Sequence, residues 1–143
     1  MRERRLAALV ALGVVVVSGL AVHALGPAGS ATDITGDALY AVAAYAGLVL
    51  LFPRWRRLVV GAVAALWCVG VELLQLTGVP VALADRFPPI ALVLGSGFDA
   101  RDLLVYLCAV GVTVAVDRVG VALAARTATN RGGPRAKPPE PPG

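Results

Sequence analysis

Residues 58–78 read LVVGAVAALWCVGVELLQLTG, an apolar run that is interrupted only by Glu72 and Gln75 near its end. An α-helix rises ~1.5 Å per residue, so about 20 residues cover the ~30 Å hydrocarbon core of a bilayer. The run therefore predicts a helix that spans a membrane. Arg54, Trp55, Arg56 and Arg57 precede it, and tryptophan beside arginine is typical of the membrane interface.

The composition of the whole chain supports a membrane protein. Of its 143 residues 58% are hydrophobic and 15% are charged, and the mean hydropathy is +0.79. In average soluble domains about 45–50% of the residues are hydrophobic and about 25% are charged. A small soluble fold leaves too much of its chain exposed to bury this much apolar surface, which excludes an ordinary cytosolic enzyme. We expect no nucleic-acid partner despite the pI of 9.7, because the basic residues flank apolar runs.

Three further apolar runs complete the predicted set of spanning helices, at 6–25, 36–52 and 102–125. The first is longer than the ~7–15 residues of a signal-peptide core, so we expect an uncleaved helix rather than a cleaved signal peptide. The second stops at Pro53, which cannot continue a helix without losing a backbone hydrogen bond. These runs predict an all-α fold, an integral membrane four-helix bundle.

The connection between the third and fourth runs is long and rich in proline and glycine. Its apolar part, 90–94, is too short to cross a bilayer, so we expect residues 79–101 to be re-entrant or interfacial on the outer side. Residues 127–143 are rich in Arg, Gly and Pro, and we expect a disordered tail after a single domain at 1–126.

The basic residues predict the orientation. Four crossings place both termini on one side, and that side then holds eleven of the thirteen basic residues. They are Arg2, Arg4, Arg5, Arg54, Arg56, Arg57, Arg118, Arg126, Arg131, Arg135 and Lys137. Only Arg86 and Arg101 fall on the other side. Loops rich in Lys and Arg remain in the cytoplasm, so we expect both termini to be cytoplasmic.

Acidic residues gather near the outer ends of three of the predicted helices, each with a polar partner three or four residues away. Residues at this spacing share one face of a helix. We therefore predict that the three polar stripes converge on one ligand-binding pocket. The candidate residues are Asp37, Tyr40, Glu72, Gln75, Arg86, Asp99, Asp102 and Tyr106.

Several of these residues have a simpler interpretation. Thr35 would cap the second helix with Asp37 in its first turn, and Asp99 or Asp102 would do the same for the fourth. Asp117 and Arg118 are typical of a boundary pair whose long side chains reach the interface.

Glu72 differs because it lies within a predicted span, where a charge costs at least ~2.5–3.5 kcal/mol. It would either stay ionised against Arg86 or Arg101, or be protonated and donate a hydrogen bond.

Nothing in the sequence indicates a metal or another cofactor. Cys68 and Cys108 lie in apolar runs without a Cys-x-x-Cys motif, and His23 is the only histidine. The chain also lacks Gly-x-Ser-x-Gly, His-Glu-x-x-His and P-loop motifs, so we identify no catalytic residue.

Three motifs resemble a known family when they are taken together: GDALYAVAAY from Gly36, VELLQL from Val71, and the stretch from Arg86 through LGSGFDARDLLVY. Their order and spacing are similar to those of the bacterial membrane proteins called domain of unknown function 2809. The pattern also resembles VanZ-type teicoplanin-resistance proteins. This resemblance implies a small four-helix protein of the bacterial cell envelope, and it carries over all eight candidate residues as motif positions.

The function expected from these features is binding of a lipid head group, glycolipid or glycopeptide-like ligand by the acidic pocket, in an accessory or resistance-type role. Carboxylates, tyrosine hydroxyls and an amide suit hydroxyl-rich or cationic ligands. Two alternatives remain: an enzyme that uses paired carboxylates on a lipid-linked substrate, and a small proton-linked transporter with Glu72 as its titrating group.

Overall fold

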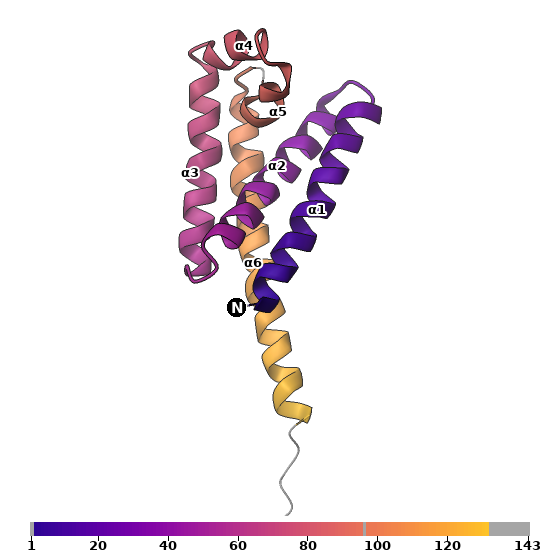
Figure 1. Cartoon of the computed structure of the whole chain (residues 1–143), viewed down its shortest axis with the longest axis vertical. Helices are drawn as coiled ribbons and strands as arrows, with labels where there is room; N and C mark the ends of the chain where they lie inside the picture. Colours follow the sequence, from indigo (N-terminus) through magenta and orange to yellow (C-terminus); the bar gives the residue numbers. More distant parts are fainter. Residues whose placement is uncertain (1, 96, 132–143) are drawn as a thin grey trace, which may run out of the picture.

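The computed structural model describes residues 2–95 and 97–131, and throughout these residues the regular structure is helical (Figure 1). The four long helices are α1 (Arg2–Leu25), α2 (Ser30–Leu51), α3 (Arg57–Gln75) and α6 (Ala100–Arg131). Between α3 and α6 lie α4 (Val79–Ala84), the 3-10 turn η1 (Pro88–Ile90) and α5 (Ala91–Leu94). The predicted all-α fold with four long apolar helices is thus confirmed.

All four long helices contain a segment that is long and apolar enough to span a membrane, which in α6 is Ala100–Gly120. Their outward faces carry large exposed apolar side chains, among them Leu66, Leu104 and Val112, which are 63–70% exposed. Apolar surface of this extent marks contact with a partner or a membrane. Together with the composition, it supports a multi-pass membrane protein.

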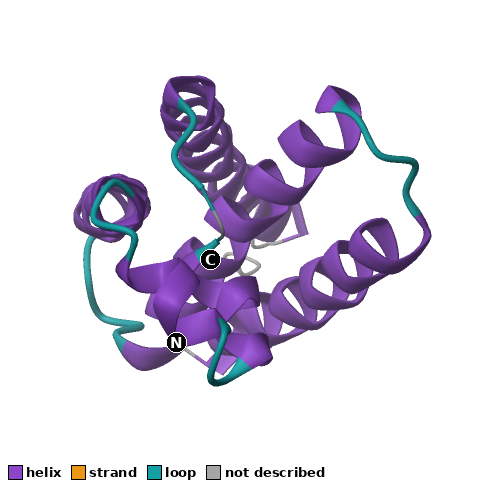
Figure 2. Ribbon diagram, turned by 90° about the horizontal axis from the view of Figure 1, so that it is seen from above, coloured by secondary structure: helices purple, strands orange, loops and turns teal. Residues whose placement is uncertain are grey.

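The core is built from three stripes of residues spaced four apart, one on each of α2, α3 and α6. Such rows form the ridges by which helices pack into one another's grooves. The buried residues are Ala41, Tyr45 and Val49; Val60, Ala64 and Cys68; and Tyr106, Val110 and Val114. Helix α1 packs mainly along α2 and contributes only Ala8 to the core among the described residues (Figure 2).

The direction of each helix places the same kinds of residue at the same end of the bundle. The start of α1, the turn between α2 and α3, and Asp117 of α6 lie at one end, which we call the basic end. The other end, which we call the acidic end, contains the starts of α2 and α6, the end of α3 and the short helices (Figure 1).

The helix boundaries differ from those expected. Helix α2 begins at Ser30, with Gly29 before it, so Thr35 is not its N-cap and Asp37 is not in its first turn. Thr35 instead donates a hydrogen bond to the carbonyl of Ala31, one turn earlier. Stabilisation of the first turn of α2 therefore does not explain the presence of an acid at Asp37.

Helix α6 runs to Arg131, beyond the expected end at residue 125. The helix therefore includes residues 127–131, which were expected to belong to the tail. The rest of the expected tail, 132–143, lies outside the described residues. Of the connection, residues 79–94 fold across the ends of α3 and α6 as short helical pieces.

Candidate functional site

Three acidic side chains continue the three core stripes by one turn, all toward the acidic end. Asp37 lies four residues before Ala41, Glu72 four after Cys68, and Asp102 four before Tyr106. Because the stripes face one another, the acids meet where the stripes end. The carboxyl groups of Asp37 and Asp102 are neighbours, and Glu72 lies near both.

Glu72 is completely buried, although it lies only three residues before the end of α3. Its Oε1 accepts a hydrogen bond of 2.7 Å from the backbone N–H of Asp99, just before α6. A carboxylate is unfavourable at a helix C-terminus, where the dipole is negative. The neighbouring connection, rather than its own helix, thus provides the partner of Glu72.

Of the two alternatives for Glu72, the ion pair with Arg86 or Arg101 is not found within the described residues. Within residues 2–95 and 97–131 no ion pair involves Glu72. Arg101 instead pairs with Asp99 at 3.3 Å and with Asp102 at 3.6 Å. Arg86 is exposed after α4 and forms no ion pair in the described part of the chain, so the structure does not bring it to the acidic cluster.

Asp99 has a capping role as well. Its Oδ1 accepts a 2.9 Å hydrogen bond from the backbone N–H of Arg101, the second residue of α6. The capping interpretation of Asp99 is therefore confirmed, and Asp102 lies in the first turn of α6.

Two tyrosines link the acids to the rest of the bundle. Tyr106 is buried and donates to Oδ1 of Asp37 across 3.3 Å, and its ring lies 6.1 Å from that of Tyr40. Tyr40 donates to the carbonyl of Val93 at 2.8 Å and accepts from the indole N–H of Trp67 at 2.9 Å. Trp67 was not among the predicted site residues; its position five residues before Glu72 gives no signal of this contact.

Gln75 fixes the connection over the site. Its Nε2 donates to the carbonyl of Leu94 at 2.9 Å. Gly95 follows with φ +68°, a backbone region that favours glycine. A Cβ atom at Gly95 would also overlap Nε2 of Gln75. Glycine is thus required at this position both for its backbone conformation and for the close approach.

Four oxygen atoms of the cluster are buried without a hydrogen-bond partner in the described structure. They are Oδ2 of Asp37, Oε2 of Glu72, Oε1 of Gln75 and Oδ1 of Asp102. A buried acceptor without a donor costs about 1–3 kcal/mol, and more when it is charged. The site is therefore rich in acceptors and short of donors. The arrangement suits hydroxyl or ammonium groups, which supply donors.

The described residues contain no group of three or more His, Cys, Asp or Glu side chains placed to hold a metal ion. Cys68 is buried and Cys108 is exposed, and both are free thiols.

A second polar cluster lies at the basic end and differs from the predicted boundary pair. Asp117 does not pair with Arg118. Its carboxylate instead binds Arg4 of α1 at 3.2 Å and Arg57 of α3 at 3.1 Å, and it accepts a 2.8 Å hydrogen bond from Tyr45 of α2. All four long helices are joined through one carboxylate. No local pattern indicates these partners, because 113 residues separate Arg4 from Asp117.

Comparison with protein families identifies the class to which this bundle belongs. The family model described as protein of unknown function (DUF2809) matches residues 28–112, more than half of the chain. The chain therefore belongs to the DUF2809 family, as the three motifs predicted. The matched segment contains all eight candidate residues and the whole connection between α3 and α6. No curated protein and no solved structure matches the chain.

Proposed function

We propose that this DUF2809 protein binds a donor-rich head group, hydroxylated or cationic, at its acidic end. The observation that carries the proposal is a group of four buried oxygens from three helices that lack a hydrogen-bond partner, of which only Oδ1 of Asp102 has a cation near it in the described structure, Nε of Arg101 at 3.6 Å. A head group with hydroxyl or ammonium donors would satisfy them and offset the electrostatic repulsion between neighbouring carboxylates. Glycolipids and glycopeptide-like ligands have this chemistry, which agrees with the VanZ-like character of the motifs.

The proposed ligand is linked to lipid because of where the cluster lies. Exposed apolar residues, Leu73 and Leu104 among them, cover the outer faces of α3 and α6 close to Glu72 and Asp102. A lipid chain would pack against these faces while its head group reaches the carboxyl groups. We further propose that the acidic end faces away from the cytoplasm of a bacterial cell, as the distribution of basic residues predicts.

The proposal is tested by thermal unfolding of the purified full-length protein in a neutral detergent. Phosphatidylethanolamine and a glucosyl diacylglycerol serve as the two donor-bearing probes, and phosphatidylcholine, whose head group lacks N–H and O–H donors, as the reference. We expect either donor-bearing probe to raise Tm, since a ligand at about 100 times its Kd stabilises by about 2.7 kcal/mol.

Glu72→Gln should abolish this rise in Tm while changing the stability of the unliganded protein by less than about 1 kcal/mol. The amide oxygen can still accept from the N–H of Asp99, and no arginine loses its partner. The control is Asp33→Asn, which removes an exposed acid from the first turn of α2 and should leave the rise unchanged. Equal stabilisation by phosphatidylcholine, or an unchanged rise in Glu72→Gln, would contradict the proposal.

One observation favours the enzymatic alternative. The adjacent carboxyl groups of Asp37 and Asp102 have the proximity needed for a general acid and a general base. Under this alternative a glucosyl diacylglycerol would be hydrolysed during incubation, and the release of free glucose would distinguish catalysis from binding.

A further inference from the structure

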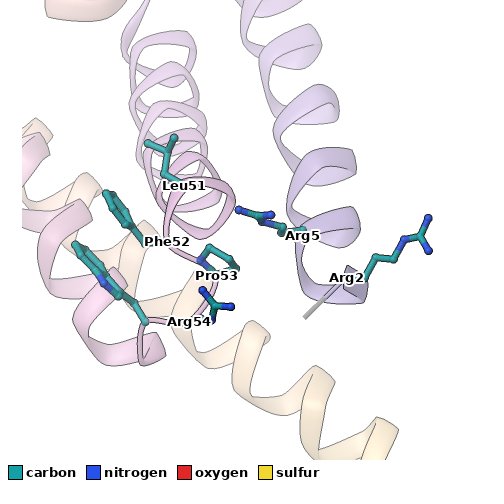
Figure 3. A pocket seen from close by; sticks show the side chains of 7 residues that line it. Arg2, Arg5, Leu51, Phe52, Pro53 and Arg54 are labelled. Carbon is teal, nitrogen blue, oxygen red and sulfur yellow. The ribbon is translucent and has the colours of Figure 1, made fainter.

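A cavity of about 460 Å³ lies at the basic end, between the start of α1 and the turn that follows α2. Figure 3 shows its lining. The side chain of Arg5 extends from α1 toward Leu51 and Pro53, and Arg54 lies beside Pro53. Arg2 also lines the cavity, although its side chain extends away from the α2 turn. This region lies at the opposite end of the bundle from the acidic cluster.

The arginines of the cavity carry positive charge, and the acid beside them in the sequence is Glu3, in the first turn of α1. Glu3 forms no ion pair within the described residues. Asp117 is the nearby acid that forms ion pairs, and it is already bound by Arg4 and Arg57. Across residues 2–95 and 97–131, no ion pair is formed by Arg2, Arg5 or Arg54. The cavity therefore favours an anion, and arginine is well suited to hold phosphate because its donors form a planar fork.

One wall of the cavity is the turn after α2, which is held in place, and the arginine side chains that line the rest are exposed. Arg4 donates to the carbonyls of Pro53 and Trp55 at 2.9 and 3.0 Å, which holds the turn against α1. The rings of Phe52 and Trp55 stack with their centroids 4.1 Å apart and their planes at 9°. The Asp117 cluster thus positions the wall of the cavity through Arg4.

The surroundings of the cavity favour a lipid over a free anion. Leu51, which lines the cavity, is 69% exposed, and Leu6 and Leu9 on α1 are 62% and 56% exposed. Phe52 and Trp55 are aromatic residues at a helix end, as is typical of a membrane interface. A phosphate at the arginines would leave its acyl chains beside these leucines. Basic pockets between spanning helices bind anionic head groups in this manner.

We propose that this cavity binds the phosphate of an anionic phospholipid. The site needs no contribution from the acidic end, so it does not depend on the proposed head-group site there. It would fix the depth of α1 and of the α2 turn in the membrane through one bound lipid.

The test is native mass spectrometry of the full-length protein in a neutral detergent, with phosphatidylglycerol titrated as the probe. We expect one tightly bound lipid in the unsubstituted protein. Arg5→Gln with Arg54→Gln should weaken its binding by on the order of tenfold or more, because two charge-assisted contacts to phosphate are lost. The charge-retaining pair Arg5→Lys with Arg54→Lys should retain an intermediate affinity.

The matched control is Arg56→Gln with Arg118→Gln, two exposed arginines at the same end that do not line the cavity. It removes the same charge and should change the affinity by less than about twofold. An equal loss in the control would show general electrostatic attraction and overturn the site. A second measurement compares the Tm of the protein with phosphatidylglycerol and with inorganic phosphate at millimolar concentration. We expect inorganic phosphate to leave Tm unchanged. If it raised Tm as much as the lipid does, the cavity would be a site for a free anion and the lipid proposal would be overturned. The helix content of both double glutamine variants, measured by circular dichroism, should equal that of the unsubstituted protein. If the variant with weaker lipid binding had also lost helix content, the loss of binding would reflect unfolding and would contradict the proposed site.

Discussion

The two ends of the bundle close the same helical core with opposite electrostatic arrangements. At the basic end a single carboxylate, Asp117, receives two guanidinium groups and one hydroxyl. At the acidic end three carboxyl groups face one another, and Arg101 is the one cation that contacts any of them within the described residues. The first arrangement gives its carboxylate two cationic partners and a hydroxyl donor, whereas the second leaves carboxyl and amide oxygen atoms without hydrogen-bond donors.

This difference underlies the proposal of a binding site at the acidic end only. A paired cluster stabilises the fold, and removal of one partner leaves uncompensated charges. A cluster that lacks donors would gain from a ligand that supplies them, and buried ionisable groups inside membranes are functional-site hypotheses by default. Substitutions at the two ends should therefore have unequal effects on stability.

The largest effect is expected for Asp117→Ala. It removes the common partner of Arg4 and Arg57, whose side chains are 19% and 29% exposed. Loss of one member of a buried ion pair costs about 3–5 kcal/mol, and partial exposure lowers the expected cost to about 2–3 kcal/mol. Reversible unfolding in mixed detergent would measure this. The control Asp33→Ala should lie within about 0.5 kcal/mol of the unsubstituted protein, and a similarly small change in Asp117→Ala would refute the structural role of the basic end.

A smaller and more local effect is expected for Gly95→Ala at the acidic end. The φ of +68° is strained for alanine by about 1–3 kcal/mol, and the added Cβ would displace Gln75 from the carbonyl of Leu94. Hydrogen exchange should accelerate over residues 91–95 and leave the backbone at Asp117 unchanged. Gly97→Ala is the matched control, because a Cβ atom there meets nothing within 4 Å. Unchanged exchange in Gly95→Ala would show that Gln75 does not hold the connection in place.

The smallest effects on the free energy of unfolding are expected when a single tyrosine hydroxyl is removed at either end. The two substitutions allow a direct comparison of the ends. Tyr45 donates across 2.8 Å to a carboxylate that also binds two arginines, whereas Tyr106 donates across 3.3 Å to Asp37. A hydrogen bond to a charged group contributes about 1.5–3 kcal/mol, and an O–H···O bond longer than about 3.0 Å contributes less. Tyr45→Phe should therefore destabilise by about 1.5 kcal/mol and Tyr106→Phe by about 0.5 kcal/mol. The reverse order in denaturant unfolding would remove the contrast between the ends.

Much of the candidate site was predictable because side-chain direction follows helix periodicity. Asp37, Glu72 and Asp102 each continue a core row at four-residue spacing, so a sequence that predicts the core stripes also predicts where these acids point. Arg86 could not be assigned in this way, since it lies in the connection between short helices. Its position depends on how prolines and glycines fold the connection, which no periodic pattern specifies.

The sequence by itself determined the four long helices and the separation of acidic and basic side chains to opposite ends. The reason is that apolar length fixes each spanning helix, and alternating direction then fixes which end each residue reaches. Only the tertiary structure decided the partners: Asp117 with Arg4 and Arg57, and Glu72 with the backbone N–H of Asp99. These contacts join residues 27 to 113 positions apart, and their distances depend on helix packing angles and on the fold of the connection. Neither is encoded in a local pattern of residues.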